Sequence, residues 1–87
     1  MKHKIGFIGL GLIGGSIAKA IRQYYPDYEI VAFDKNKESL ALATQESMID
    51  VAATTIDNNF QNCNYIFLCA PVAYNTAYLK QLTEYLN

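Results

Sequence analysis

The run IGFIGLGLIGGS at residues 5–16 constrains this chain most strongly, because glycines interrupt an apolar segment at fixed intervals. Gly9, Gly11 and Gly14 have the G-x-G-x-x-G spacing that is typical of a turn binding the pyrophosphate of a dinucleotide. In such a turn, the first glycine permits a sharp bend and the second lets the backbone approach the ligand, while the third lets the next helix lie close to the strand. The run therefore predicts a buried strand, a phosphate-binding turn and the start of a helix.

Two further features support this interpretation. The backbone amides near Leu12 and Ile13 would be unpaired donors at the start of the helix, where the helix dipole also favours an anion. Asp34 ends a β-branched and aromatic segment at residues 28–33, and an acid there can accept hydrogen bonds from the hydroxyls of an adenosine ribose. A carboxylate at this place repels the additional phosphate of NADP, so the predicted cofactor is NAD. The alternative is that Asp34 only starts a turn, and the adjacent Lys35 would soften the discrimination between the two cofactors.

Strands and helices are predicted to alternate along the chain. The predicted strands lie at residues 3–8, 28–33 and 64–70, with a loop and a short third strand within residues 48–53. The predicted helices lie at residues 12–25, 37–47 and 74–87. Such alternation is typical of an α/β fold in which right-handed crossovers link the strands of a parallel sheet. We predict the spatial order 3-2-1-4 of a Rossmann-like dinucleotide-binding fold, so that the glycine turn faces residues 69–72 across one site. Because a complete fold of this type has two halves, residues 1–87 are predicted to be a partial NAD-binding domain, truncated before the second half is complete.

Side-chain periodicity predicts which faces are buried. The first helix is expected to turn one apolar stripe towards the sheet, formed by Ile13, Ile17, Ile21 and Tyr24. Asn36 is a credible N-cap for the second helix, whose inner face carries Leu40 and Ala43. Gly6 is expected to make room for a crossing helix, and Ile56 and Phe60 are the large apolar anchors of the polar stretch before the fourth strand.

Composition excludes several classes of function. The chain is 52% hydrophobic, with a net charge of −1 and scattered lysines and arginines, which argues against a nucleic-acid partner. No apolar stretch reaches the roughly 20 residues that span a bilayer, and no signal peptide is recognisable, so no membrane association and a cytoplasmic location are expected. Cys63 and Cys69 lie in or beside one extended strand, about 20 Å apart and too far for a disulfide.

Catalytic groups are absent from the predicted site. The chain offers no Ser-His-Asp arrangement, no metal-ligand cluster and no facing carboxylates, so neither catalytic nor metal-binding residues are predicted. His3 is placed at the far end of the first strand, and Asp50 and Asp57 are interpreted as caps or turn formers. A tyrosine stripe in the last helix, formed by Tyr74, Tyr78 and Tyr85, could stack on a ligand, but packing is the favoured interpretation.

Residues 9–18, GLGLIGGSIA, resemble the N-terminal signature of the prephenate dehydrogenases and their arogenate-using relatives. The resemblance extends to residues 32–34, 47–50 and 66–72 and so covers essentially the whole chain. Asn64 is one departure, because an acidic residue often precedes this strand in the family. The resemblance implies an NAD-dependent oxidative decarboxylation of prephenate to 4-hydroxyphenylpyruvate, with hydride transfer to NAD, in tyrosine biosynthesis.

The same resemblance implies roles for individual residues. The implied cofactor-binding residues are Gly9, Gly11, Leu12, Ile13 and Gly14 at the pyrophosphate, Asp34 at the adenosine ribose, and Ala70, Pro71 and Val72 beside the nicotinamide half. The family's catalytic histidine, its substrate pocket and its helical dimerisation domain lie beyond this chain, and His3 does not match the histidine motif. The fragment is therefore expected to be inactive alone, and the full-length enzyme to be a homodimer acting on the small molecule prephenate. The alternatives are another NAD(P)-dependent oxidoreductase, of the arogenate or 3-hydroxyacid dehydrogenase or pyrroline-carboxylate reductase type, and a non-catalytic nucleotide-binding module.

Overall fold

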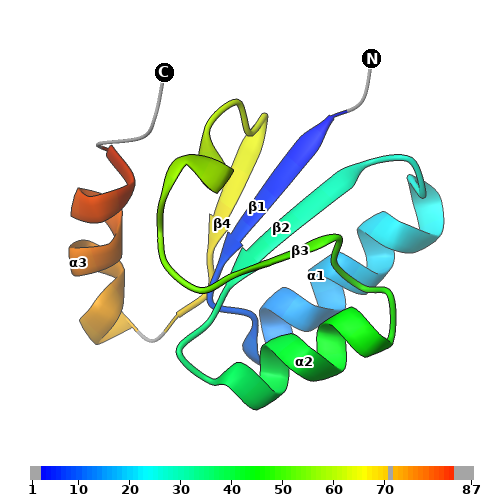
Figure 1. Cartoon of the computed structure of the whole chain (residues 1–87), viewed down its shortest axis with the longest axis horizontal. Helices are drawn as coiled ribbons and strands as arrows, with labels where there is room; N and C mark the ends of the chain where they lie inside the picture. Colours follow the sequence, from blue (N-terminus) through cyan, green and yellow to red (C-terminus); the bar gives the residue numbers. More distant parts are fainter. Residues whose placement is uncertain (1–2, 71, 84–87) are drawn as a thin grey trace.

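The computed structural model describes residues 3–70 and 72–83. Its strands form one parallel sheet with helices on both faces (Figure 1). In chain order the elements are β1 (Lys4–Ile8), α1 (Gly11–Tyr24), β2 (Glu29–Phe33), α2 (Lys37–Gln45), β3 (Val51–Ala53), the short 3-10 helix η1 (Asn58–Phe60), β4 (Tyr65–Leu68) and α3 (Val72–Thr83). The sheet order is β3-β2-β1-β4 and every pairing is parallel, which confirms the predicted order 3-2-1-4 and the Rossmann-like class. The part of the last predicted helix after residue 83 lies outside the described residues.

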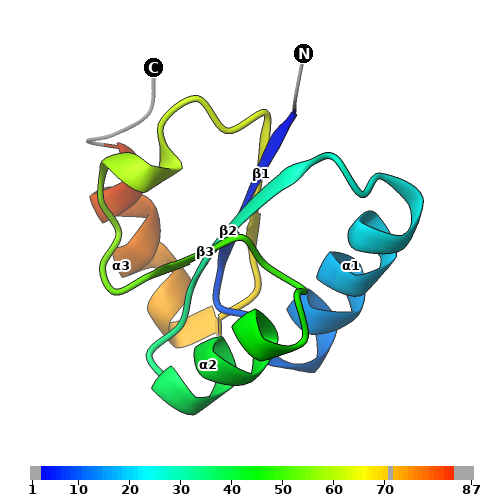
Figure 2. The same cartoon turned by 45° about the vertical axis from the view of Figure 1, so that its right-hand side comes forward.

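The two faces of the sheet are covered by different elements. Figure 2 shows α1 and α2 on one side, and α3 together with η1 on the other. Successive β1 side chains alternate between these layers, because Phe7 packs in the core below α1 and α2 whereas Ile8 packs with η1 and α3. Both side chains are fully buried, and each such burial is worth about 1.5–3 kcal/mol. A central strand that is apolar on both faces is therefore what places β1 in the middle of the sheet.

The buried face of α1 differs from the prediction. Gly14 and Ala18 are its buried residues, while Ile13 and Tyr24 are 73% and 72% exposed. Ile17 and Ile21 are partly buried and flank this small-residue stripe, as expected. The physical reason is the close approach of α1 to the sheet, since a Cβ on Gly14 would lie 3.0 Å from the Gly9 carbonyl oxygen. Apolar periodicity selected the large side chains, but only small ones fit at this distance.

Gly6 makes room for a different element from the one predicted. A Cβ there would lie 3.0 Å from the Phe60 ring and 3.1 Å from the Cys63 sulfur. The neighbour is therefore the connection between β3 and β4 rather than a crossing helix. Phe60 and Ile56 are buried in this layer, which confirms them as the anchors of an otherwise polar stretch.

Polar contacts hold the far end of the sheet, away from the glycine turn. The Arg22 guanidinium lies 2.8 Å from the Asp50 carboxylate and also donates to the carbonyls of Pro26, Tyr28 and Ser47. Asp50 in turn accepts a hydrogen bond from the amide of Ile30 at 2.8 Å. These contacts tie the end of α1 to the start of β2 and the segment before β3. Asp50 is thus a structural acid.

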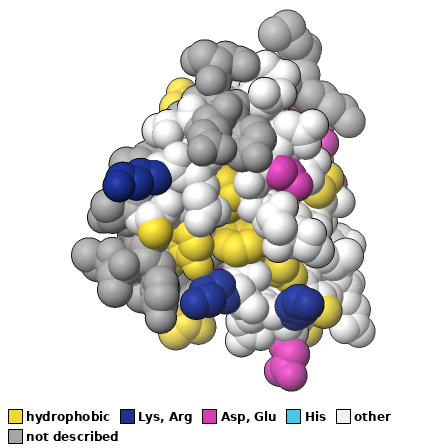
Figure 3. Space-filling view, turned by 60° about the vertical axis from the view of Figure 1, so that its left-hand side comes forward, with side chains coloured by type: hydrophobic (Ala, Val, Ile, Leu, Met, Phe, Trp, Pro, Cys, Tyr) yellow, Lys and Arg dark blue, Asp and Glu magenta, His cyan; other side chains and the backbone are white. Residues whose placement is uncertain are grey.

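The described residues form no continuous basic stripe on the face that Figure 3 shows. On this face, which carries α3, apolar side chains form a central patch and the lysine and arginine side chains are separate from one another. No helix in the described part of the chain is long and apolar enough to cross a membrane.

Candidate functional site

The carboxyl ends of β1, β2 and β4 open on one cavity of about 360 Å³. Residues 9–11 of the glycine turn, Asp34 after β2, and Ala70 after β4 all line it. This is the switch point of the sheet, where the crossovers from β1 and β4 leave towards opposite faces and where open α/β sheets bind their ligands. The predicted meeting of the glycine turn with the end of the fourth strand is therefore confirmed.

Gly9 is the residue around which the three strand ends meet. It has φ +84°, and its amide donates to the Phe33 carbonyl at 2.6 Å. A Cβ at this position would lie 2.6 Å from the backbone nitrogen of Ala70, a distance that no side chain tolerates. Only glycine satisfies both requirements, the positive φ and the contact with backbone. The first glycine of the motif thus permits the bend, as predicted.

Gly11 faces open space at the start of α1. It has φ +54°, and a Cβ there would meet nothing within 4 Å. The residue before it, Leu10, is at the N-cap position and makes no side-chain cap hydrogen bond, so among the described residues no side chain at this position accepts from the first-turn amides. A bare backbone with unsatisfied donors and the positive end of a helix dipole is suited to an anion such as a pyrophosphate.

Asp34 joins the glycine turn to the start of α2. One carboxylate oxygen accepts from the Leu10 amide at 2.8 Å, and the other accepts from the Asn36 amide at 2.9 Å. A carboxylate offers about four acceptor positions, so two remain for hydroxyl groups of a ligand. The contact with Leu10 had no signal in the sequence, because it depends on the pairing of β1 with β2. It fixes the carboxylate's orientation before any ligand arrives.

The other implied cofactor residues have varied positions. Leu12 and Ile13 lie in the first turn of α1, with side chains 92% and 73% exposed, so any role at the pyrophosphate belongs to their amides. Ala70 lines the cavity opposite Gly9. Pro71 lies outside the described residues, as does the side chain of Val72, although the backbone of Val72 begins α3.

Tyr78 belongs to the packing of α3 and also borders the cavity. It is buried, and its ring meets Phe33 edge-on with centroids 5.6 Å apart. The favoured packing interpretation of this tyrosine is confirmed. Tyr85 and the side chain of Tyr74 lie outside the described residues.

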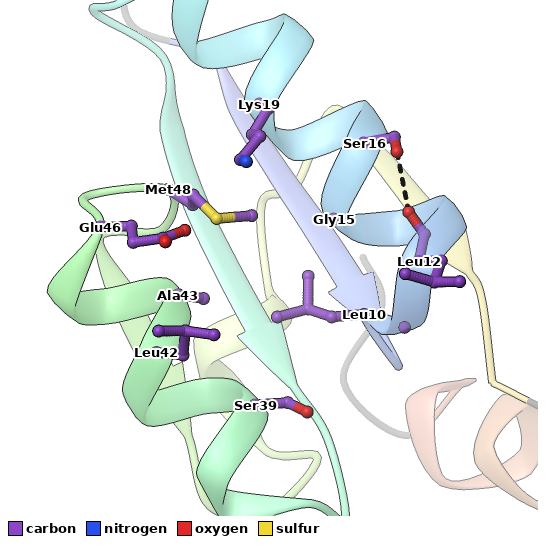
Figure 4. Close-up of a pocket in the computed structure, with 11 residues that line it drawn as sticks. Leu10, Leu12, Gly15, Ser16, Lys19, Ser39, Leu42, Ala43, Glu46 and Met48 are labelled. Carbon is purple, nitrogen blue, oxygen red and sulfur yellow. Dashed lines mark hydrogen bonds between the residues drawn. The ribbon is translucent and has the colours of Figure 1, made fainter.

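A second cavity, of about 410 Å³, separates α1 from α2 (Figure 4). Leu10, Ala43 and Met48 lie between the two helices, whereas Leu12 projects from the first turn of α1. The Ser16 hydroxyl in its wall is committed to the Leu12 carbonyl at 2.9 Å. This groove adjoins the first cavity through Leu10 and Gly11. It was not predicted, because its walls come from two helices that are separated in the chain.

The ionisable side chains that line the first cavity, among the described residues, are those of Asp34, Lys35, Cys69 and Tyr78. Burial raises the pKa of the Cys69 thiol, which keeps it protonated and unreactive at neutral pH. His3 lies against Tyr28, with ring centroids 4.9 Å apart, at the opposite end of β1. Asn64 is also at that end, where its side chain accepts from the Lys4 amide at 2.8 Å. Among the described residues there is no group of three or more His, Cys, Asp or Glu that could hold a metal ion.

Curated relatives are similar to this chain in sequence. Prephenate dehydrogenase from Bacillus subtilis (strain 168) is 33% identical over 84 residues, which are 97% of this chain and 23% of that protein. Cyclohexadienyl dehydrogenase from Zymomonas mobilis (strain ZM4) is 35% identical over 71 residues, which are 82% of this chain and 24% of that protein. The chain thus resembles the N-terminal part of prephenate dehydrogenases and spans about a quarter of these relatives' length.

Solved structures of other proteins have a similar fold over nearly the whole of this chain. Prephenate dehydrogenase from A. aeolicus, in complex with hydroxyphenyl propionate and NAD+, superimposes with a TM-score of 0.89 at 28% identity, covering 100% of this chain and 31% of that one. S. aureus TarJ, in complex with NADPH, gives a TM-score of 0.78 at 23% identity over 99% of this chain and 26% of its own, a likeness of fold alone. Residues 4–87 match the family model described as "NADP oxidoreductase coenzyme F420-dependent", and the chain belongs to this oxidoreductase family.

Proposed function

We propose that this chain is the NAD-binding part of a prephenate dehydrogenase. The complete enzyme would oxidise and decarboxylate prephenate to 4-hydroxyphenylpyruvate in tyrosine biosynthesis, releasing carbon dioxide and passing a hydride to NAD. One observation carries the cofactor assignment, namely that Asp34 and the uncapped start of α1 lie on the same cavity. The similarity to prephenate dehydrogenases over nearly the whole chain supports the reaction.

The pyrophosphate would bind at the first turn of α1. The amides of Gly11, Leu12 and Ile13 are the donors, and the missing Cβ of Gly11 leaves the space in front of them open. The hydrogen bond from the Leu10 amide to Asp34 holds this turn in place without consuming those donors. The chain therefore presents a preorganised anion site rather than one that forms on binding.

The adenosine ribose would bind at Asp34, whose two remaining acceptor positions match two ribose hydroxyls. The carboxylate would repel the 2′-phosphate of NADP, so we assign NAD as the preferred cofactor although the family's description names NADP. The nicotinamide half would extend past Ala70, Pro71 and Val72 at the end of β4, as in the family signature. When bound, the nicotinamide supplies the hydride chemistry, and the chain supplies binding and orientation.

The substrate site and the acid–base groups would come from a further part of the protein. Among the described residues, the ionisable side chains that line the cavity are those of Asp34, Lys35, Cys69 and Tyr78. Asp34 is engaged by two backbone amides, burial raises the pKa of the Cys69 thiol, and the Tyr78 ring packs against Phe33, so we assign the catalytic acid and base to none of them. We propose a helical domain after residue 87 that binds prephenate, completes a homodimer and carries the catalytic histidine, with the whole enzyme in the cytoplasm. The isolated chain would then bind the cofactor without turning over prephenate.

Calorimetric titration of the protein with NADH and NADPH tests the proposal. We expect NADH to bind at least tenfold more tightly than NADPH, because the two ligands differ only in the phosphate that faces Asp34. A preference for NADPH would contradict the assignment of Asp34 and favour an NADP-dependent member of the family. The absence of binding by both ligands would contradict a cofactor site at the start of α1.

A further inference from the structure

The start of α2 is closed by its own side chains. The side-chain oxygen of Asn36 accepts hydrogen bonds from the amides of Glu38 at 2.9 Å and Ser39 at 3.2 Å. The amide of Asn36 itself donates to Asp34 at 2.9 Å. Two first-turn amides of α2, those of Glu38 and Ser39, are therefore occupied by a side-chain oxygen, in contrast to the start of α1, where no side chain among the described residues caps the helix.

These occupied donors lie where cofactor choice would be made. Asp34, Lys35, Asn36 and Ser39 line the same cavity, so a ribose bonded to Asp34 would place a 2′-substituent against the start of α2. A phosphate needs hydrogen-bond donors or cations to replace its hydration, and charge-assisted bonds from backbone amides are the usual means at a helix start. In this chain those amides already have partners.

We propose that Asn36 is a second determinant of cofactor choice, which excludes the 2′-phosphate of NADP by holding the α2 amides that would otherwise bind it. The inference rests on the proposed NAD site. Asp34 disfavours the phosphate by repulsion, and Asn36 disfavours it by removing its donors. The two effects are separable, because repulsion acts through charge whereas the cap acts through hydrogen bonds that a neutral side chain makes.

Lys35 would attract the 2′-phosphate that the cap at Asn36 is proposed to exclude. Its side chain is exposed and lines the cavity directly beside Asp34, where a cation would attract a phosphate. With the cap removed, a 2′-phosphate would meet two free amides in addition to this cation. With the cap in place, those two amides stay bonded to Asn36, and the nearest acid, Asp34, repels the phosphate.

The test compares two substitutions at the same position. Asn36→Gly removes the acceptor and frees the amides of Glu38 and Ser39, and glycine is a tolerated N-cap, so the helix is retained. Asn36→Ser keeps a hydroxyl acceptor and hence a cap, and it serves as the matched control. The ratio of the dissociation constants for NADPH and NADH isolates the 2′-phosphate, because every other contact is common to both ligands.

We expect Asn36→Gly to lower this ratio about tenfold, equivalent to about 1.4 kcal/mol, and Asn36→Ser to leave it within about threefold of wild type. An unchanged ratio in Asn36→Gly, with NADH still bound, would overturn the role of Asn36 while the NAD site stands. If the wild-type protein does not bind NADH at all, the proposed function itself is overturned.

A measurement on the wild-type protein covers the case in which the glycine variant does not fold. The amide resonances of Glu38 and Ser39 are followed in ¹H–¹⁵N spectra during titration with adenosine 2′,5′-bisphosphate, while Gly11 reports on the 5′-phosphate. We expect the Gly11 resonance to move and the Glu38 and Ser39 resonances to stay in place. Large shifts at Glu38 and Ser39 would show that the phosphate displaces the cap, and would overturn the proposal.

Discussion

Substitution of the first two glycines of the turn by alanine separates folding from binding. Gly9 and Gly11 both have positive φ, +84° and +54°, so either alanine incurs about 1–2 kcal/mol of backbone strain. Only at Gly9 does the added Cβ also meet backbone, 2.6 Å from the nitrogen and 2.7 Å from the Cα of Ala70. Relieving that overlap requires β1 and the end of β4 to move apart, and overpacking of this kind costs about 1–3 kcal/mol more.

We therefore expect Gly9→Ala to destabilise the fold by about 2–5 kcal/mol and Gly11→Ala by only about 1–2 kcal/mol. A chain of 87 residues has a stability of about 4–13 kcal/mol, so Gly9→Ala removes a large share of it. Binding should follow the opposite order among folded variants. The new methyl group of Gly11→Ala stands in the open space where a pyrophosphate would approach, and the affinity for NADH should fall at least tenfold.

Urea unfolding followed by far-UV circular dichroism measures the stability of each variant, and calorimetry with NADH measures its binding. Equal destabilisation by the two substitutions would refute the claim that Gly9 is required by contact with Ala70. Binding of NADH to Gly11→Ala with wild-type affinity would refute the placement of the pyrophosphate at the start of α1.

Three further perturbations test the site and the core. Asp34→Ala leaves the amides of Leu10 and Asn36 without acceptors, so we expect about 1–3 kcal/mol of destabilisation in urea and at least a tenfold loss of NADH affinity. The control Asp57→Ala removes a cap outside both cavities, so it should lower stability without changing NADH affinity. Phe60→Ala should lower the free energy of unfolding by about 3–5 kcal/mol. Gly6→Ala should destabilise the Phe60→Ala variant less than the wild type, because the new Cβ would lie 3.0 Å from the Phe60 ring. Additive effects in a double-mutant cycle measured by urea unfolding would disprove the contact. Burial raises the pKa of both thiols, with Lys4 opposing the shift at Cys63, so the folded state keeps them protonated after the unfolded chain has begun to ionise. Stability should be fully present below the ordinary thiol pKa and fall as pH rises through and above it, and the fall measured in urea at a series of pH values should shrink when both cysteines are replaced by alanine.

The alternation of apolar segments with helical periodicity was sufficient to predict the parallel sheet and its order. The prediction succeeded because short apolar strands separated by amphipathic helices have few ways to form a sheet through right-handed crossovers. The glycine spacing located the turn for a similar reason, since Gly9 occupies a position that no larger residue could fill and a Cβ on Gly14 would be tightly packed, 3.0 Å from the Gly9 carbonyl oxygen. Each of these signals is local in the sequence.

The features that were missed depend on contacts between distant segments. The bond between Asp34 and the Leu10 amide follows from the register that pairs Ile8 with Phe33, which no single segment encodes. The face of α1 that is buried carries Gly14 and Ala18 while Ile13 is exposed, which apolar periodicity does not report because small residues give it little signal. The residues that line the cavity are therefore easier to predict from a sequence than the contacts that hold them in place.

The most direct test of the central claim is a ¹H–¹⁵N correlation spectrum of the protein recorded during titration with NAD+. We predict that the largest shifts occur at the amides of Gly11, Leu12 and Ile13, with a second group at Asp34 and Lys35, since these line the place assigned to the pyrophosphate and ribose. Shifts confined to the groove between α1 and α2, around Ala43 and Met48, or no shifts at saturating NAD+, would contradict the account.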